Sequence, residues 1–240
     1  MLELYHWEPN GASARVLISL EEKGLAYASR YVNVLCVEQY RAALLASSAT
    51  AELPVLVSDG AALSEASDIC EYLEEAFPAT ALMPPDARGR WRVRVWQKRI
   101  DEGVAASVCE LAWHAYAARS RAALDAAQLA ARRGRTSSDE ELARARERIA
   151  RALAGIEADL SRTPWLAGAK YSLADIAVFA YFAYLPGLCP ELLNERQTPR
   201  SLGWVRAIAA RPAVRAALAR GRVPEPFAVA APGPEQIRWG

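Results

Sequence analysis

The sequence predicts two domains, a small N-terminal α/β domain followed by an all-α domain. Residues 1–80 alternate between short apolar stretches with strand periodicity and longer stretches with helical periodicity. Residues 88–222 show helical periodicity almost throughout. A turn-forming Met-Pro-Pro-Asp run at 83–86 separates these parts, and a proline-rich tail occupies 223–240. We therefore expect a domain boundary at this run and a C-terminal surface extension.

The N-terminal domain is expected to follow the order β-α-β-α-β-β-α. Alternating side chains indicate a first strand, and the Glu-Pro-Asn-Gly run at 8–11 is a turn. Gly24 follows the first helix at the position where a left-handed backbone is common. The Ser-Asp-Gly run at 58–60 is typical of a hairpin turn. The expected strands are 2–7, 27–34, 53–57 and 61–64, and the expected helices are 13–23, 40–46 and 66–77.

The second domain is expected to bury three helical faces. An apolar stripe formed by Trp91, Val95, Trp96 and Ile100 defines its first long helix. A charged amphipathic helix follows at 142–160. Ser172 and Asp175 have the spacing of a capping box, in which each side chain bonds to a backbone N–H of the other. The run after them, 176–185, is apolar on nearly all sides, which predicts a central buried helix.

Composition argues against several classes of function. The net charge is +1 and the pI about 7.7, so there is no electrostatic reason to expect nucleic acid or an anionic membrane. No apolar run approaches the roughly 20 residues that span a bilayer, and the N-terminus has no signal-peptide pattern. We therefore expect a cytoplasmic protein. The four cysteines, Cys36, Cys70, Cys109 and Cys189, are scattered, so buried free thiols are expected and a metal site is not.

Several motifs occur in a defined order along the chain. They are Leu53-Pro54, Ser-Glu-Ala-Ser-Asp-Ile at 64–69, Trp-Leu-Ala-Gly at 165–168 with Ser-Leu-Ala-Asp-Ile at 172–176, and the segments 199–204 and 210–214. Together these motifs resemble the glutathione transferase superfamily over about residues 2–220. The resemblance implies a thioredoxin-like N-terminal domain with a cis-proline before the third strand. It also implies glutathione as co-substrate and a dimer, formed either with itself or with a paralogue.

A subgroup resemblance sharpens the expected reaction. The stretches 22–25, 37–39, 69–78, 94–98 and 101–102 are similar to those of bacterial β-etherases. Those enzymes use glutathione to cleave β-aryl ether bonds of lignin-derived compounds. The resemblance therefore implies that glutathione thiolate attacks an ether-bearing carbon of an aromatic substrate.

Ser13 is the expected catalytic residue. A free thiol has a pKa near ~8.5, so a transferase needs a hydrogen-bond donor and a positive field to ionise glutathione. A serine in the first turn of a helix offers the donor, and the helix N-terminus adds roughly half a positive charge. The resemblance places Ser13 at the family's serine position, although a simple helix cap is its alternative role. Tyr5 and Asn10 are alternative donors, and because Ala12 precedes Ser13 where relatives carry cysteine, a mixed-disulfide mechanism is disfavoured.

The resemblance also assigns the glutathione-binding residues. The residue before the cis-proline pairs through its backbone with the cysteinyl part of glutathione in relatives. Glu65 matches the acid that faces the γ-glutamyl amine, and Asp101 matches an acid that can reach across a dimer. A helix-start acid and a surface carboxylate are the alternative roles of these two residues. The full expected set is Leu53, Pro54, Glu65, Ala66, Ser67 and Asp101.

Two departures from the family pattern concern this glutathione site. Ala66 stands where relatives have Ser or Thr to bind the γ-glutamyl carboxylate, with Ser67 one step along. A hydrogen bond to a charged group contributes ~1.5–3 kcal/mol, so its loss weakens binding by roughly 10- to 150-fold. The backbone N–H of Ala66 is still available to the carboxylate. Upstream, the Ser-Ala-Thr-Ala run at 48–51 replaces the Asn-Pro-x-Gly of many relatives.

An aromatic acceptor is expected to bind between the domains. Trp7, Trp113 and Tyr116 are candidate walls because flat rings suit an aromatic substrate. Core packing is the alternative for each of them. Two other functions stay open alongside the enzyme: a non-catalytic subunit of a heterodimeric β-etherase, and a stress protein that binds hydrophobic ligands.

Overall fold

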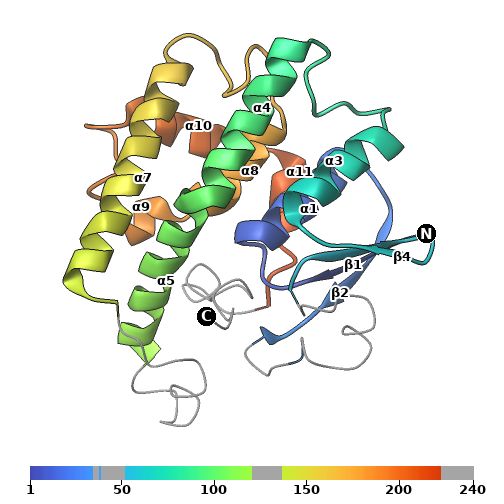
Figure 1. Ribbon diagram of the computed structural model, residues 1–240, viewed down its shortest axis with the longest axis horizontal. Helices are drawn as coiled ribbons and strands as arrows, with labels where there is room; N and C mark the ends of the chain where they lie inside the picture. Colours follow the sequence, from blue (N-terminus) through green and yellow to red (C-terminus); the bar gives the residue numbers. More distant parts are fainter. Residues whose placement is uncertain (35–37, 39–51, 121–136, 223–240) are drawn as a thin grey trace.

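The computed structural model describes residues 1–34, 38, 52–120 and 137–222 (Figure 1). A small mixed sheet and its helices form the N-terminal domain, and helices form the remainder (Figure 1). The expected helix at 40–46, the loop at 48–51 and the tail at 223–240 lie outside the described residues.

The sheet has four strands in the order β2-β1-β3-β4. The first two, β1 (Leu2–His6) and β2 (Tyr27–Tyr31), run parallel, with Leu4 opposite Ser29. Parallel neighbours need a crossover connection, and α1 (Gly11–Glu22) supplies it. An antiparallel hairpin completes the sheet: β3 (Val55–Ser58) pairs with both β1 and β4 (Ala61–Leu63).

Small shifts separate these strands from their predicted bounds. The second strand ends at Tyr31 rather than 34, although the Val32 N–H still donates to the His6 carbonyl at 2.8 Å. The third begins at Val55 because the cis Leu53–Pro54 bond lies just before the ladder. Gly60 has φ +87° in the predicted hairpin turn, a left-handed conformation that favours glycine. The sequence therefore predicted each of these strands with errors confined to their ends.

Two apolar clusters lie on opposite faces of the sheet. Leu4 and Leu56, which face each other across β1 and β3, join the main core beneath α1 and α3 (Ala66–Ala76). The next residues along each strand point the other way, and Val55 packs in a second cluster with Leu53, Trp7, Val32 and Val34. In Figure 1, α1 lies between the sheet and the helical domain.

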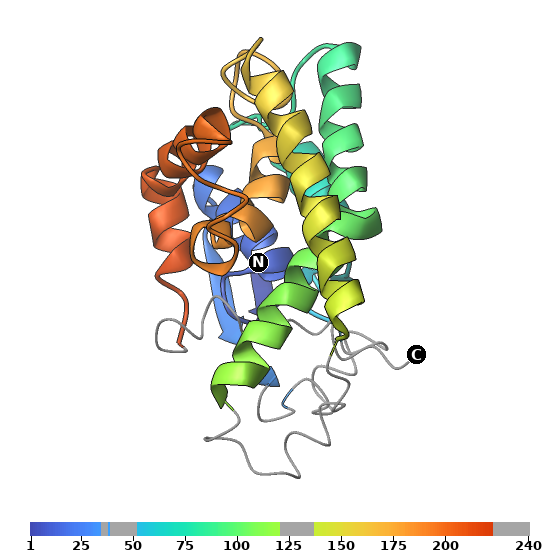
Figure 2. The same ribbon diagram turned by 90° about the vertical axis from the view of Figure 1, so that its left-hand side faces the viewer.

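The helical domain begins with one long, bent run. It consists of α4 (Ala87–Arg99), a π-helical turn η3 (Ile100–Val104) and α5 (Ala105–Ser120). Figure 2 shows α4 and α7 side by side, on the side of the domain away from α10 and α11. The remaining helices are α7 (Asp139–Leu160), α8 (Leu173–Phe182), α9 (Leu185–Leu188), α10 (Pro199–Ala209) and α11 (Pro212–Leu218).

The central helix α8 is buried over its whole length, as its apolar composition predicts. Its predicted capping box is present. The Ser172 N–H donates to Asp175 Oδ2 at 3.0 Å, and Ser172 Oγ accepts from the Ala174 N–H at 3.3 Å. The Asp175 carboxylate also accepts from the Leu166 N–H at 3.0 Å and from the Trp204 indole at 2.9 Å. Burial raises the pKa of Asp175 to about 6, although these donors favour its charged form.

The predicted apolar stripe on α4 is confirmed only in part. Trp96 and Ile100 are buried, but Val95 is only partly buried and Trp91 is 60% exposed. Val93, which was not predicted, is buried instead. Trp91 precedes Val93 by two positions, which is about 200° around a helix, so it points away from the core. The amphipathic prediction for α7 is confirmed, with Ile149, Leu153 and Ile156 among its buried residues.

In the part of the chain that the structure describes, no helix is long and apolar enough to span a bilayer. No group of three or more potential metal ligands occurs among the same residues. Cys70 and Cys189 are buried free thiols, Cys109 is partly exposed, and Cys36 is outside the described ranges.

Candidate active site

A cleft of about 460 Å³ opens between the two domains. Its walls come from α1, the segment before β3, the start of α3, the η3–α5 region and α8. All six residues that the resemblance assigned to glutathione binding line it: Leu53, Pro54, Glu65, Ala66, Ser67 and Asp101. The other lining residues are Ala12, Arg15, Glu52, Asp68, Ala105, Ala106 and Tyr181.

The segment before β3 forms one wall. The Leu53–Pro54 peptide bond is cis, as the resemblance implied. Leu53 as a whole is only 4% exposed, and its side chain packs in the second apolar cluster. It is therefore the main chain of Leu53 that a ligand in the cleft can meet.

The N-terminus of α3 forms the adjacent wall. Glu65 is its N-cap residue and has φ +64°, a left-handed conformation that non-glycine residues rarely adopt. The Glu65 side chain makes no capping hydrogen bond to this end of the helix. The first N–H groups of a helix have no partner within it, and the helix dipole places partial positive charge there. The backbone at Ala66 and Ser67 is thus suited to an anionic group of a ligand.

A buried cation, Arg15, connects this wall to the helical domain. Its guanidinium donates from one nitrogen to Asp101 Oδ1 and from another to Ser67 Oγ, both at 2.5 Å. Ser67 in turn donates to Asp101 Oδ2 at 2.6 Å, which closes a three-residue ring. Burial alone would lower the pKa of Arg15, but the Asp101 carboxylate beside it reverses that effect and the pKa is raised.

Sequence reasoning did not identify Arg15. Its side chain is 3% exposed, and it lies within an otherwise apolar stretch of α1. A charged residue inside such a stretch was the available signal, since buried charges are found almost always with partners. Its partners are 52 and 86 positions away, so sequence periodicity does not indicate them.

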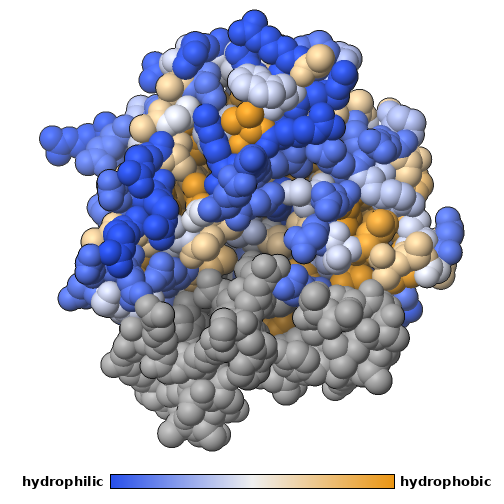
Figure 3. Space-filling view, viewed as in Figure 1, coloured by the Kyte–Doolittle hydropathy of each residue, from blue (hydrophilic) through white to orange (hydrophobic). Residues whose placement is uncertain are grey.

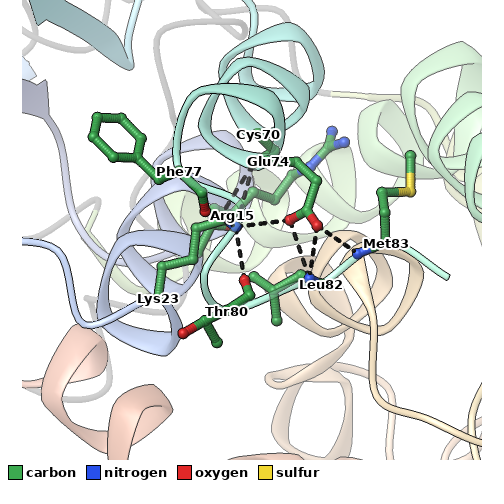
Figure 4. Close-up of polar contacts among 9 residues, drawn as sticks. Arg15, Lys23, Cys70, Glu74, Phe77, Thr80, Leu82 and Met83 are labelled. Carbon is green, nitrogen blue, oxygen red and sulfur yellow. Dashed lines mark hydrogen bonds and ion pairs between the residues drawn. The ribbon is translucent and has the colours of Figure 1, made fainter. Parts of the chain in front are cut away.

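A second buried cation lies two turns further along α1 (Figure 4). The Lys23 ammonium contacts Glu74 Oε2 at 2.8 Å and donates to the Phe77 and Thr80 carbonyls at 3.0 and 2.8 Å. Glu74 also accepts from the Leu82 N–H at 3.0 Å, in the segment that joins the domains. This cluster ties α1 and α3 to the connection between the domains.

Ser13 lies in the first turn of α1, as expected, but is not among the residues that line the cleft. Its side chain is 3% exposed, and its Oγ accepts from the Trp7 N–H at 3.2 Å. The hydroxyl proton is not used in that bond. The alternative donor Tyr5 instead donates to Glu3 at 3.2 Å, and Asn10 is the N-cap residue of α1.

The three residues predicted to line the acceptor pocket do not share one outcome. Trp7 is fully buried in the second apolar cluster, where its ring lies 5.4 Å from that of Tyr31. The structure therefore places Trp7 in the core, which was its alternative role. The side chains of Trp113 and Tyr116 lie outside the described part of the structure. On the helical side, the described cleft wall consists of Ala105, Ala106 and Tyr181 with Asp101.

A second groove, of about 410 Å³, lies between α4, η3 and α7. Arg99, Arg148 and Arg151 line it together with Trp96. Figure 3 shows hydrophilic side chains over most of this face of α4 and α7, with apolar side chains between them. None of the predicted site residues lies in this groove, so the interdomain cleft is the candidate active site.

Two family models match the chain in the order of its domains. Residues 4–81 match the glutathione S-transferase N-terminal domain, and residues 104–212 match the glutathione S-transferase C-terminal domain. The chain belongs to the glutathione S-transferase family. Members of this family use glutathione as co-substrate.

Individual relatives agree with this assignment. Protein LigF from Sphingobium sp. strain SYK-6 is 30% identical over 236 residues, covering 89% of this chain and 91% of LigF. The crystal structure of the β-etherase LigF from the same strain superposes on this chain with a TM-score of 0.80. The sequences are 29% identical there, and the match covers 92% of this chain and 99% of LigF. Glutathione transferase F7 from Populus trichocarpa superposes at 0.77, with 25% identity and coverage of 93% and 100%. A maleylpyruvate isomerase of Ralstonia sp is 36% identical, but over only 39% of this chain and 44% of its own length.

Proposed function

We propose that this glutathione transferase cleaves β-aryl ether bonds of lignin-derived aromatic compounds. The observation that carries the proposal is the gathering of six predicted glutathione contacts in one interdomain cleft. Similarity to the β-etherase LigF over nearly the full length of both chains supports the choice of reaction.

Glutathione is proposed to lie across the cleft from the helical domain to α1. Its γ-glutamyl ammonium faces the carboxylates of Glu65 and Asp101, where charge-assisted hydrogen bonds are strongest. Its γ-glutamyl carboxylate meets the N-terminus of α3 at Ala66. The cysteinyl backbone pairs with the main chain of Leu53, beside Pro54, which directs the thiol toward the N-terminus of α1.

Ser13 is proposed to stabilise the thiolate. Its Oγ already accepts the Trp7 N–H, so its remaining O–H can donate to sulfur. A hydrogen bond to a charged group contributes ~1.5–3 kcal/mol, which lowers the thiol pKa by about one to two units. The positive end of α1 acts in the same direction.

The chemical step is a displacement at carbon. The thiolate sulfur forms a bond to the carbon that bears the aryloxy group, and the C–O bond to that group breaks. The electron pair leaves with the oxygen as a phenolate, which takes a proton from solvent. The products are a glutathione thioether and a phenol, formed in equal amounts.

A non-catalytic subunit is the second candidate, and Ala66 is the observation that favours it. At this position the hydroxyl that relatives use for the γ-glutamyl carboxylate is missing. This role requires a paralogue as partner, whereas the catalytic role is equally compatible with a second copy. In either case we propose a cytoplasmic dimer with no nucleic-acid or membrane partner, and light scattering on the purified chain tests the homodimer.

Isothermal titration with glutathione, followed by assay of a β-aryl ether dimer, tests the proposed function. We expect micromolar to low-millimolar affinity and release of one phenol per thioether formed. Glutathione binding without ether cleavage would contradict the proposed reaction. Absence of binding by the folded protein would favour the non-catalytic subunit, and binding of aromatic compounds without glutathione would favour a ligand-binding stress protein.

Ser13→Ala tests the role of the serine, with the exposed Ser161→Ala as the matched control. We expect the pKa of bound glutathione, followed by thiolate absorbance, to rise by about one to two units in Ser13→Ala. Turnover near neutral pH should fall by roughly 10- to 100-fold and recover at high pH. Full turnover with an unchanged thiol pKa would remove Ser13 from the mechanism.

A further inference from the structure

Among the described residues of the cleft, charges are unequally distributed. Four carboxylates line it, from Glu52, Glu65, Asp68 and Asp101, and Arg15 is the one lining cation in that part of the chain. The excess negative charge suits a ligand with an ammonium group. Of these four acids, Asp101 is the one to which the Arg15 guanidinium donates a hydrogen bond in the described contacts.

The hydrogen-bond directions in the Arg15 cluster determine what it offers to a ligand. Arg15 is a donor in both of its contacts, to Asp101 and to Ser67. The Ser67 proton is directed to Asp101 Oδ2. In these contacts Ser67 Oγ and the Asp101 carboxylate both keep lone pairs that a donor in the cleft can use.

This arrangement has a consequence for Ser67. With its proton on Asp101, Ser67 is not a donor to the γ-glutamyl carboxylate and does not replace the hydroxyl missing at Ala66. It is an acceptor, as is the Asp101 carboxylate, which is 40% exposed beside it. Two acceptors from different domains are thus aligned for one ammonium group.

We propose that Arg15 is a positioning residue that gives the cleft its selectivity for the free γ-glutamyl ammonium of the thiol substrate. This role rests on the proposed glutathione site. Arg15, which itself lines the cleft, acts on the ammonium through Ser67 and Asp101. The planar guanidinium holds both acceptors at once and is itself fixed by burial. A partly exposed carboxylate without this anchor would sample several rotamers, and ordering it on binding would weaken the ammonium contact.

Three thiol ligands separate this role from a general structural one. They are glutathione, its deaminated analogue glutaryl-cysteinylglycine, and its decarboxylated analogue 4-aminobutanoyl-cysteinylglycine. Dissociation constants are measured by calorimetry for the wild type, Arg15→Met and Arg15→Lys. Arg99→Met is the matched control because Arg99 lines the other groove, where its guanidinium lies 4.9 Å from the centroid of the Trp96 ring.

The wild type and Arg99→Met should prefer glutathione over the deaminated analogue by about tenfold or more, the value of a charged hydrogen bond. In Arg15→Met this preference should fall to within about threefold, while the preference over the decarboxylated analogue stays unchanged. Arg15→Lys keeps a cation against Asp101 and so protects folding. It should also lose most of the preference, because an ammonium does not reproduce the guanidinium fork.

Unchanged preference in Arg15→Lys or Arg15→Met would overturn the inference. Equal loss of both preferences would overturn it too, because that pattern indicates general damage to the cleft. Failure of the wild type to bind glutathione at all would instead contradict the proposed function, so the two failures are distinguishable.

Discussion

The two buried cations of α1 lie at opposite ends of its contact with α3, and they differ in what their partners expose. Arg15 holds Asp101, a carboxylate that is 40% exposed at the cleft. Lys23 holds Glu74, whose carboxylate is 12% exposed and already accepts backbone N–H groups. We therefore expect a buried cation to serve the proposed binding site where its partner retains access to solvent. The Lys23–Glu74 pair, which is enclosed by backbone groups, instead lies within the N-terminal domain and contacts the segment that leads to the helical domain.

The two side chains suit these tasks. The flat guanidinium of Arg15 directs separate nitrogens to Ser67 and Asp101, which belong to different domains. The ammonium of Lys23 is a compact charge with three donors, and it sits where two carbonyls and a carboxylate converge. Between these ends, Ser19 and Cys70 contact each other at 3.3 Å, so polar contacts recur along the whole interface.

The largest expected effect is on the stability of the fold, when the enclosed Lys23–Glu74 pair is broken. Lys23→Met leaves the Glu74 carboxylate buried without its cation, so the free energy of unfolding should fall by about 3–5 kcal/mol. Urea denaturation measures it. Lys98→Met is the control, because that lysine is 71% exposed and its loss should change stability by about 0–1 kcal/mol. Equal stability of the two variants would contradict a structural role for the enclosed pair, and altered ligand selectivity in Lys23→Met would break the comparison.

A third buried charge tests whether a cation is required to keep a buried carboxylate ionised. Asp175 has four hydrogen-bond contacts and no salt bridge within the described residues. Its folded pKa of about 6 exceeds the unfolded value of about 3.9. The fold therefore favours the protonated form of this carboxyl. The stabilisation that results is fully present below pH 4 and is lost as pH rises through 6, which lowers the free energy of unfolding by about 3 kcal/mol. Titration of its carboxyl carbon by NMR should show a midpoint near 6, and a midpoint below 4 would show that the hydrogen bonds outweigh burial.

A smaller effect is expected on glutathione affinity when Ala66, in the cleft, is changed. Ala66→Ser restores the hydroxyl that relatives carry beside the γ-glutamyl carboxylate. Glutathione should bind about two- to tenfold more tightly, and the decarboxylated analogue should gain nothing. Calorimetry with Ala105→Ser as control measures the change. Equal gains for both ligands would place the new hydroxyl away from the carboxylate.

The smallest effect is expected for a pair that is exposed on both sides. Arg94 of α4 donates to both oxygens of Glu71 of α3 at 3.2 and 3.1 Å, with exposures of 56% and 31%. Arg94→Ala should lower the free energy of unfolding by about 0–1 kcal/mol, and high salt should remove even this difference. A loss as large as that of Lys23→Met would show that burial is not what distinguishes the pairs.

Local patterns predicted most of the backbone. The hairpin at Gly60, the C′ glycine Gly24 and the capping box of α8 depend on residues within four positions of each other. The six predicted glutathione-binding residues were proposed in the same way, because family motifs are short runs of sequence. Their convergence on one cleft followed once the order of elements was correct.

Side-chain direction was harder to predict. Trp91 and Trp7 are both large and apolar, yet one is 60% exposed and the other is fully buried away from the cleft. Composition does not distinguish these environments, since it is the neighbouring elements that cover or expose a helix face. The prediction that Trp91 belongs to the buried stripe on α4 was wrong for this reason.

The order of elements, the turn and cap positions and the family motifs were determined by the sequence itself, because each depends on neighbours along the chain. The pairing of Arg15 with Ser67 and Asp101, and of Lys23 with Glu74, was decided only by the tertiary structure. These partners are 51 to 86 positions apart. Arg15 needs the two domains brought together to reach Asp101, and Lys23 needs the N-terminal domain folded to reach Glu74. The selectivity proposed for the cleft therefore depends on contacts that no local pattern specifies.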